Sequence, residues 1–111
     1  MAEPFLEVHP TLLKEWMDQN KPIQIIDVRE PWEFEKTHLP KSCLVPLSNF
    51  DQQDFSRQFS KDDWIVVVCH HGVRSLRTTR SLHEMGFQNV YSLQGGLDQW
   101  SREVDPSFPT Y

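Results

Sequence analysis

Two short apolar runs dominate the hydrophobic pattern of the chain. They cover residues 23–26 and 64–68, are rich in β-branched side chains, and are bounded by polar or turn residues. Such runs are typical of strands that are buried on both faces of a parallel sheet. Weaker apolar runs predict three further strands, at residues 5–8, 43–46 and 90–93.

Helical patterns fall between the expected strands. Leu12, Leu13, Trp16 and Met17 form an apolar stripe behind Pro10, a residue that suits a first helical turn. Further helices are expected at 30–36, 75–85 and 96–103, whereas 48–59 shows only a partial stripe and stays ambiguous. Strands that alternate with helices predict an α/β domain with a central parallel sheet and short crossovers.

The length and charge of the chain narrow its function class. The 111 residues fit one domain, 1–111, with an irregular C-terminal tail at 105–111. A formal charge of −5 argues against a nucleic-acid module, which would be basic. Residues 1–10 lack the basic start of a signal peptide, and no apolar run is long enough to span a bilayer. We therefore expect a cytoplasmic domain without nucleic-acid or membrane partners, whose two cysteines are too few for a disulfide scaffold.

The strongest predicted strand ends directly in a thiol. Cys69 follows residues 64–68, and a turn that contains Gly72 and Arg74 then leads into a helix. Ligands of parallel α/β sheets bind at the carboxyl ends of the strands. The amides of such a turn can point at the sulfur and stabilise a thiolate, while glycine permits a positive φ and arginine adds positive charge. The pattern favours a nucleophilic cysteine over one that merely fills space.

Three parts of the chain resemble the signatures of the rhodanese family of single-domain sulfurtransferases. The similar segments are 25–30 with 33–34 and 38–40, then 69–75, then 86–90 with 93–96 and Trp100. The resemblance implies a rhodanese-like three-layer domain, with a central, mostly parallel five-stranded sheet flanked by helices. It covers the chain from about Ile23 to Trp100.

The resemblance also implies a mechanism. The Cys69 thiolate would attack the outer sulfur of an anionic donor such as thiosulfate, become a persulfide, and pass the sulfur to cyanide, a thiol or a protein. The Arg74 side chain would help to hold a sulfonate or sulfite. Backbone amides would bind the persulfide anion, from His70, His71, Gly72, Val73, Arg74 and Ser75. No metal, nucleotide or organic cofactor motif is visible in the sequence. The resemblance implies that the sulfur itself is carried covalently, so no cofactor is expected.

The length of the loop from Cys69 to Arg74 favours sulfur transfer over phosphate hydrolysis. Four residues lie between Cys69 and Arg74, as in family sulfurtransferases, whereas phosphatases of the same fold use five. Other interpretations stay open. The chain could relay sulfur between proteins, from a cysteine desulfurase or to a thiolation enzyme, or it could be a phosphatase or a non-catalytic binding module.

Three charged residues are accessory candidates. Arg77 follows Arg74 on the expected helix and either attracts anionic donors or belongs to a solvated helix face. Asp27 and Arg29 end another strong strand. The resemblance implies that these two mainly brace loops through charge-assisted hydrogen bonds, with a direct role toward substrate as the second choice.

The side chains of His70, His71 and Cys43 are expected to have structural roles and not chemical ones. His70 and His71 are expected to line the mouth of the loop and not to bind metal, because adjacent residues in a tight turn usually point apart and no second Cys/His cluster completes a zinc site. Cys43 is expected to be a buried small residue. Where the family often has glycines, the chain has Thr37 and Lys41, which puts the local turn geometry in question.

Overall fold

A sheet of five parallel strands forms the centre of the computed structural model, which describes residues 6–109. Its order is β1-β5-β4-β2-β3, and each neighbouring pair runs parallel. The strands are β1 (Glu7–Val8), β2 (Ile23–Asp27), β3 (Ser42–Leu44), β4 (Trp64–Val68) and β5 (Asn89–Leu93). The α/β class and the five-stranded sheet are therefore confirmed, with every pairing parallel.

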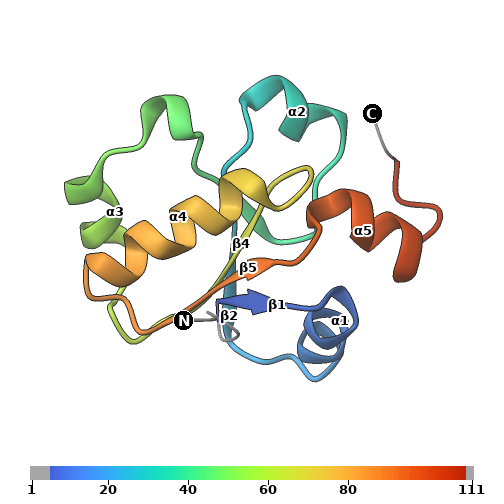
Figure 1. Cartoon of the computed structure of the whole chain (residues 1–111), viewed down its shortest axis with the longest axis horizontal. Coiled ribbons are helices and arrows are strands. Elements are labelled where there is room, and N and C mark those ends of the chain that lie inside the picture. Colours follow the sequence, from blue (N-terminus) through green and yellow to red (C-terminus); the bar gives the residue numbers. More distant parts are fainter. Residues whose placement is uncertain (1–5, 110–111) are drawn as a thin grey trace.

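Helices connect the strands (Figure 1). They are α1 (Pro10–Asp18), α2 (Pro31–Lys36), the 3-10 turn η1 (Leu47–Asn49), α3 (Gln52–Gln58), α4 (Val73–Glu84) and α5 (Gly96–Glu103). The ambiguous stretch 48–59 thus divides into η1 and α3, because the Asp51 carboxylate caps α3 by accepting hydrogen bonds from the amides of Gln53 and Asp54. No helix within residues 6–109 is long and apolar enough to cross a membrane.

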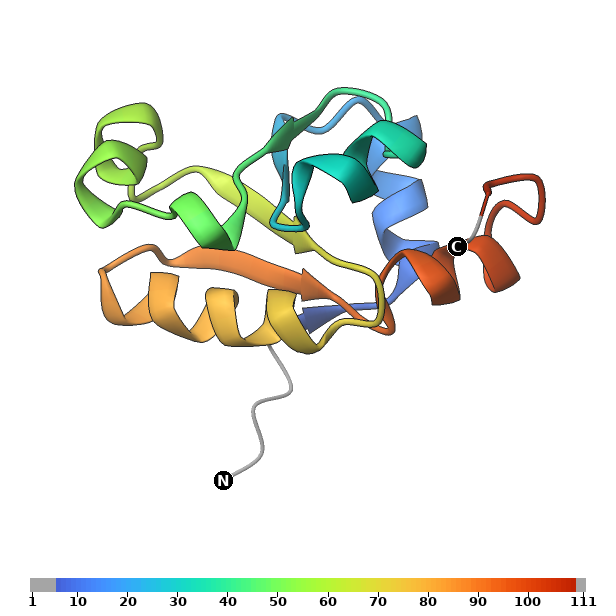
Figure 2. The ribbon, with the colours of Figure 1, turned by 90° about the horizontal axis from the view of Figure 1, so that it is seen from above.

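Alternate residues of β4 separate two apolar cores. Ile65 and Val67 face one core, which Phe55 of α3 and Leu82 of α4 complete. Val66 and Val68 face the other core, together with residues of α1 and α5, namely Leu13, Leu97 and Trp100. Because successive side chains of a strand point to opposite faces, the sheet carries helices on both faces and forms the middle of three layers (Figure 2).

The ends of the chain follow the expectations in part. Of the first expected strand, at 5–8, residues Glu7–Val8 form β1, and Phe5 lies outside the described residues. In the C-terminal tail, Phe108 packs against the core between the sheet, α1 and α5, and its carbonyl accepts a hydrogen bond from the Ser101 hydroxyl. Tyr111, the other aromatic residue of the tail, lies outside the described residues.

The prediction that Cys43 is buried is wrong. Cys43 is exposed, whereas Cys69 is buried. The physical reason is that Cys43 lies in β3, a three-residue strand at the edge of the sheet. Strand β2 separates β3 from β4, the strand that leads into Cys69, and both cysteines are free.

Candidate active site in the loop between β4 and α4

Backbone amides surround the sulfur of Cys69. Its Sγ accepts hydrogen bonds from the amide of Gly72 at 3.0 Å and from the amide of Ser75 at 3.3 Å. Cys69 is only 1% exposed. The loop that follows β4 therefore curls around the thiol and aims N–H dipoles at it, in the manner of an anion-binding nest.

The start of α5 fixes the orientation of this loop. The carbonyl of Cys69 accepts a hydrogen bond from the Leu97 amide at 2.9 Å, and the carbonyl of His70 accepts one from the Asp98 amide at 3.0 Å. Figures 1 and 2 show the loop beside the first turn of α5. These two hydrogen bonds hold the start of the loop against α5, and the amides of Gly72 and Ser75, later in the loop, point at the sulfur.

Glycines permit this close packing. Gly72 has φ +93°, and a Cβ there would lie 3.1 Å from the amide nitrogen of Gly95. A Cβ on Gly96 would lie 2.5 Å from the Cys69 carbonyl oxygen, closer than real atoms approach. The turn 95–96, part of the C-terminal signature in the sequence, thus provides the surface on which the Cys69 loop rests.

A pair of serine hydroxyls extends the contacts of the sulfur. The Ser75 hydroxyl lies 3.3 Å from Sγ of Cys69 and 2.7 Å from the hydroxyl of Ser92. All three residues are buried. Sequence reasoning missed Ser92, although a hydroxyl within the apolar strand 90–93 was a visible signal, since buried polar groups need partners.

Arg74 points toward α2. Its Nη1 and Nη2 donate to the two carboxylate oxygens of Glu33, at 2.8 and 3.0 Å. The side chain of Glu33 is 6% exposed and that of Arg74 is 39% exposed. Glu33 lay in a segment that resembled the family signature, but nothing in the sequence paired it with an arginine 41 positions away. Arg77, further along α4, is exposed.

Asp27 and Arg29 form a buried ion pair at the end of β2. Both side chains are 0% exposed. The Arg29 guanidinium donates to the Asp27 carboxylate, with the shortest contact at 2.7 Å, and to the carbonyl of Thr37 at 2.6 Å. The pair therefore ties the end of β2 to the end of α2 and has no exposed surface toward the Cys69 loop.

The two histidines of the loop do not point apart as predicted. The rings of His70 and His71 stack, with centroids 4.1 Å apart and planes 19° apart. Their nitrogen atoms lie near the carboxylate of Asp98 in α5. Partial burial, followed by the neighbouring His71, lowers the pKa of His70 below its ordinary value of 6.5. The reason for the error is that the hydrogen bonds to α5 shape this turn, which the sequence alone did not show.

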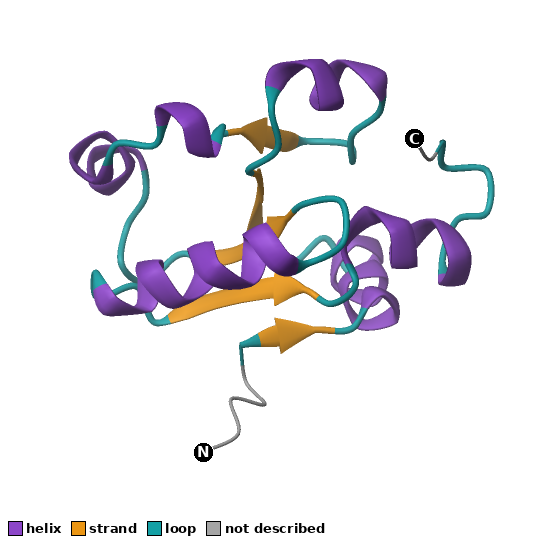
Figure 3. Cartoon of the chain, turned by 45° about the horizontal axis from the view of Figure 1, so that its top comes forward, coloured by secondary structure: helices purple, strands orange, loops and turns teal. Residues whose placement is uncertain are grey.

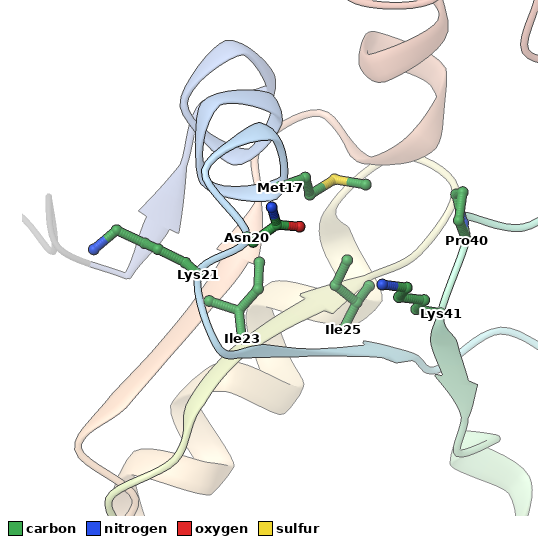
Figure 4. A pocket seen from close by; sticks show the side chains of 7 residues that line it. All are labelled: Met17, Asn20, Lys21, Ile23, Ile25, Pro40 and Lys41. Carbon is green, nitrogen blue, oxygen red and sulfur yellow. The ribbon is translucent and has the colours of Figure 1, made fainter.

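A separate pocket opens next to α1 (Figure 4). It has a volume of about 310 Å³. It is lined by Met17, Asn20, Lys21, Ile23, Ile25, Pro40 and Lys41. None of the candidate site residues contributes to this pocket, so we assign it no part in the chemistry at Cys69.

Comparison with known proteins gives consistent matches. The chain is 34% identical to the thiosulfate sulfurtransferase GlpE of Glaesserella parasuis, over 96% of this chain and 95% of that protein. It is 29% identical to the probable adenylyltransferase/sulfurtransferase MoeZ of Mycobacterium tuberculosis, over 94% of this chain but only 26% of that longer protein. The crystal structure of a rhodanese-like domain protein from Staphylococcus aureus superposes with a TM-score of 0.78 and 27% identity, covering 95% of this chain and 97% of that one.

A family model confirms the resemblance seen in the sequence. The model described as the rhodanese-like domain matches residues 9–103, which include every strand from β2 to β5 and the whole Cys69 loop. The chain therefore belongs to the family of rhodanese-like domains.

Proposed function

We propose that the chain is a sulfurtransferase that carries sulfane sulfur as a persulfide on Cys69. The observation that carries the proposal is the pair of amide hydrogen bonds from Gly72 and Ser75 to Sγ. Hydrogen bonds to the charged form favour a thiolate, which is the nucleophilic form of cysteine. The positive end of α4, a helix of 12 residues, adds to this stabilisation.

In the first half-reaction, the Cys69 thiolate attacks the outer sulfur of an anionic donor such as thiosulfate. A new S–S bond forms between Sγ and that sulfur. The S–S bond of thiosulfate breaks, and sulfite leaves with its electron pair. The negative charge then lies on the outer sulfur of the persulfide, where the loop amides from His70 to Ser75 are available to it.

In the second half-reaction, a thiophilic acceptor attacks the outer sulfur. The persulfide S–S bond breaks, the acceptor keeps the sulfur, and the electron pair of the broken bond returns to Sγ as a thiolate. The two half-reactions share one covalent intermediate, so ping-pong kinetics are expected. No external oxidant or reductant is required, because sulfur is transferred at one oxidation level.

Transfer between proteins is the second candidate function. The relatives support it, because they include the longer MoeZ protein and a putative sulfur carrier protein, YrkF of Bacillus subtilis, 28% identical to this chain. The chemistry at Cys69 is the same, but donor and acceptor are then proteins. An exposed apolar side chain in the loop itself, Val73 at 62% exposure, suits contact with a protein surface.

The proposal includes a reducing compartment. A persulfide carrier needs a free thiol, and both cysteines of the chain are free. The cytoplasm keeps thiols reduced. We therefore assign the chain to the cytoplasm as part of the proposed function.

Steady-state assays test the proposal. Transfer of sulfur from thiosulfate to cyanide should fall at least about 10³-fold in Cys69→Ser, because the nucleophile is lost. Cys43→Ser is the matched control, since it removes the exposed thiol and should leave the rate unchanged. An active Cys69→Ser variant, or turnover of an aryl phosphate that exceeds sulfur transfer, would overturn the proposal.

A second assay separates the two donors. The protein is mixed with thiosulfate or with a cysteine desulfurase and cysteine, and the persulfide on Cys69 is followed over time. Faster loading from thiosulfate supports the small-molecule donor. Slow loading from thiosulfate with rapid loading from the desulfurase makes protein-to-protein relay the function.

A further inference from the structure

Three side chains of types that can bind metal ions meet at the rim of the Cys69 loop. His70 and His71 belong to the loop, and Asp98 belongs to the first turn of α5. One ligand atom from each residue, two ring nitrogens and one carboxylate oxygen, lies within 4.8 Å of the others. His71 is exposed and the other two residues are partly buried, so an ion in solution has access to the cluster.

Backbone hydrogen bonds hold the segments that carry these side chains next to each other. The Asp98 amide donates to the carbonyl of His70 at 3.0 Å, which joins two of the three residues directly. The Leu97 amide donates to the carbonyl of Cys69 at 2.9 Å and fixes the same two segments once more. The side chains therefore do not have to be gathered from separate, mobile loops, and little backbone order is lost when an ion binds.

The donor set selects a class of ion. Two imidazoles and one carboxylate suit zinc and similar transition metals, whereas calcium and magnesium prefer oxygen ligands alone. We propose that His70, His71 and Asp98 bind a divalent transition metal ion, with zinc the best match. Three protein ligands leave a fourth coordination position open.

Small side-chain rotations suffice to close the site. Ligand atoms around a tetrahedral zinc ion lie roughly 3.3 Å apart, which follows from zinc–nitrogen bonds of about 2.0–2.1 Å. The three atoms, within 4.8 Å of one another, need to approach only a little, and the stacked rings turn about their side-chain bonds to do so. The Asp98 carboxylate also accepts a 3.0 Å contact from Arg102, a surface ion pair that is weak enough to yield.

Cobalt titration of the full chain provides the test, with zinc competition to rank the two ions. Cobalt bound by nitrogen and oxygen ligands gives visible bands without the near-ultraviolet sulfur charge-transfer band that thiolate ligands give. We expect micromolar binding, zinc displacing cobalt, and unchanged spectra in Cys69→Ser and Cys43→Ser. His71→Ala and Asp98→Asn should each weaken binding at least about 10-fold, because the loss of even an outer-shell partner of a metal ligand costs this much.

His38→Ala is the matched control. It removes another exposed histidine, one that contacts the carbonyl of Phe34 in α2, and should leave the affinity unchanged. Binding in His71→Ala and Asp98→Asn as tight as in the wild type overturns the proposal. So does cobalt binding that disappears in either cysteine variant. Since no sulfur donor is present, the result is independent of the proposed sulfur transfer.

Discussion

The guanidinium of Arg74 donates two hydrogen bonds, of 2.8 and 3.0 Å, to the carboxylate of Glu33. This pair joins the first turn of α4 to α2, next to the Cys69 loop. It also places a negative charge against the arginine that was expected to serve the sulfur donor. In this geometry the polar groups that contact the sulfur are the Gly72 amide and the amide and hydroxyl of Ser75, whereas the Arg74 side chain contacts Glu33.

Removing Arg74 should therefore destabilise the protein. Arg74→Ala takes the charged partner from the nearly buried Glu33 carboxylate and should lower the free energy of unfolding by about 1–3 kcal/mol. Arg57→Ala is the control, because Arg57 and its ion-pair partner Asp54 have side chains that are 71% and 69% exposed. This variant should change the free energy of unfolding by at most about 0.5 kcal/mol. Denaturant unfolding measures both, and equal losses would contradict the structural role of the pair.

Two glycines with positive φ allow a matched comparison. Gly72→Ala and Gly86→Ala both force an L-residue into the left-handed region, at φ +93° and +101°, at roughly 1–2 kcal/mol each. At Gly86 a Cβ meets only the Lys61 side chain at 3.8 Å, whereas at Gly72 it meets backbone at 3.1 Å.

We expect Gly86→Ala to keep its sulfur-transfer rate and Gly72→Ala to lose most of it, because only the latter shifts the loop on the turn 95–96. Denaturant unfolding curves and sulfur-transfer rates, measured for both variants, test this expectation. A Gly72→Ala variant with wild-type activity would show that close packing against α5 does not position the loop.

The buried Asp27–Arg29 pair should act on stability more than on chemistry. Asp27→Asn removes the negative charge of Asp27 from the fully buried ion pair with Arg29, which should lower the free energy of unfolding by about 3–5 kcal/mol. At a temperature where the variant remains folded, the KM for thiosulfate should match the wild type. A raised KM with unchanged stability would instead assign Asp27 to the substrate.

The charge state of His70 gives a prediction with a defined sign. Partial burial and His71 lower the pKa of His70 below its ordinary 6.5. As the pH falls below 6.5, the His70 ring binds a proton in the unfolded chain but stays neutral in the native protein. The free energy of unfolding therefore decreases until the pH falls below the pKa of His70 in the native protein. An NMR titration of the His70 ring, with a chelator present, should give a pKa below 6.5. A value at or above 6.5 would contradict the packing described for this ring.

The sheet was largely predictable, and the reason is the strength of its local pattern. The strand at 64–68 has the same limits in the structure, because β-branched residues there are buried on both faces. Helix α4 begins at Val73, two residues before the expected start, since Gly72 at φ +93° provides its cap. Lys41 has φ +63°, so it adopts the backbone conformation for which the family often uses glycine at that position.

The site was predictable only where its residues are consecutive in sequence. Cys69, Gly72 and Ser75 lie in one loop, and the structure brings them together as expected. The partners Glu33 and Asp98 come from other elements, and no periodicity or spacing connects them to the loop. Cys43 was misjudged for the same reason, because exposure at a sheet edge depends on the order of the strands (Figure 3).

Intact-protein mass spectrometry after treatment with thiosulfate tests the central claim most directly. The wild type and Cys43→Ser should each gain the mass of one sulfur atom, located on Cys69 by peptide mapping and removed by cyanide. Cys69→Ser should gain none. A sulfur adduct on the exposed Cys43, or one that persists in Cys69→Ser, would contradict the account of Cys69 as the sulfur carrier.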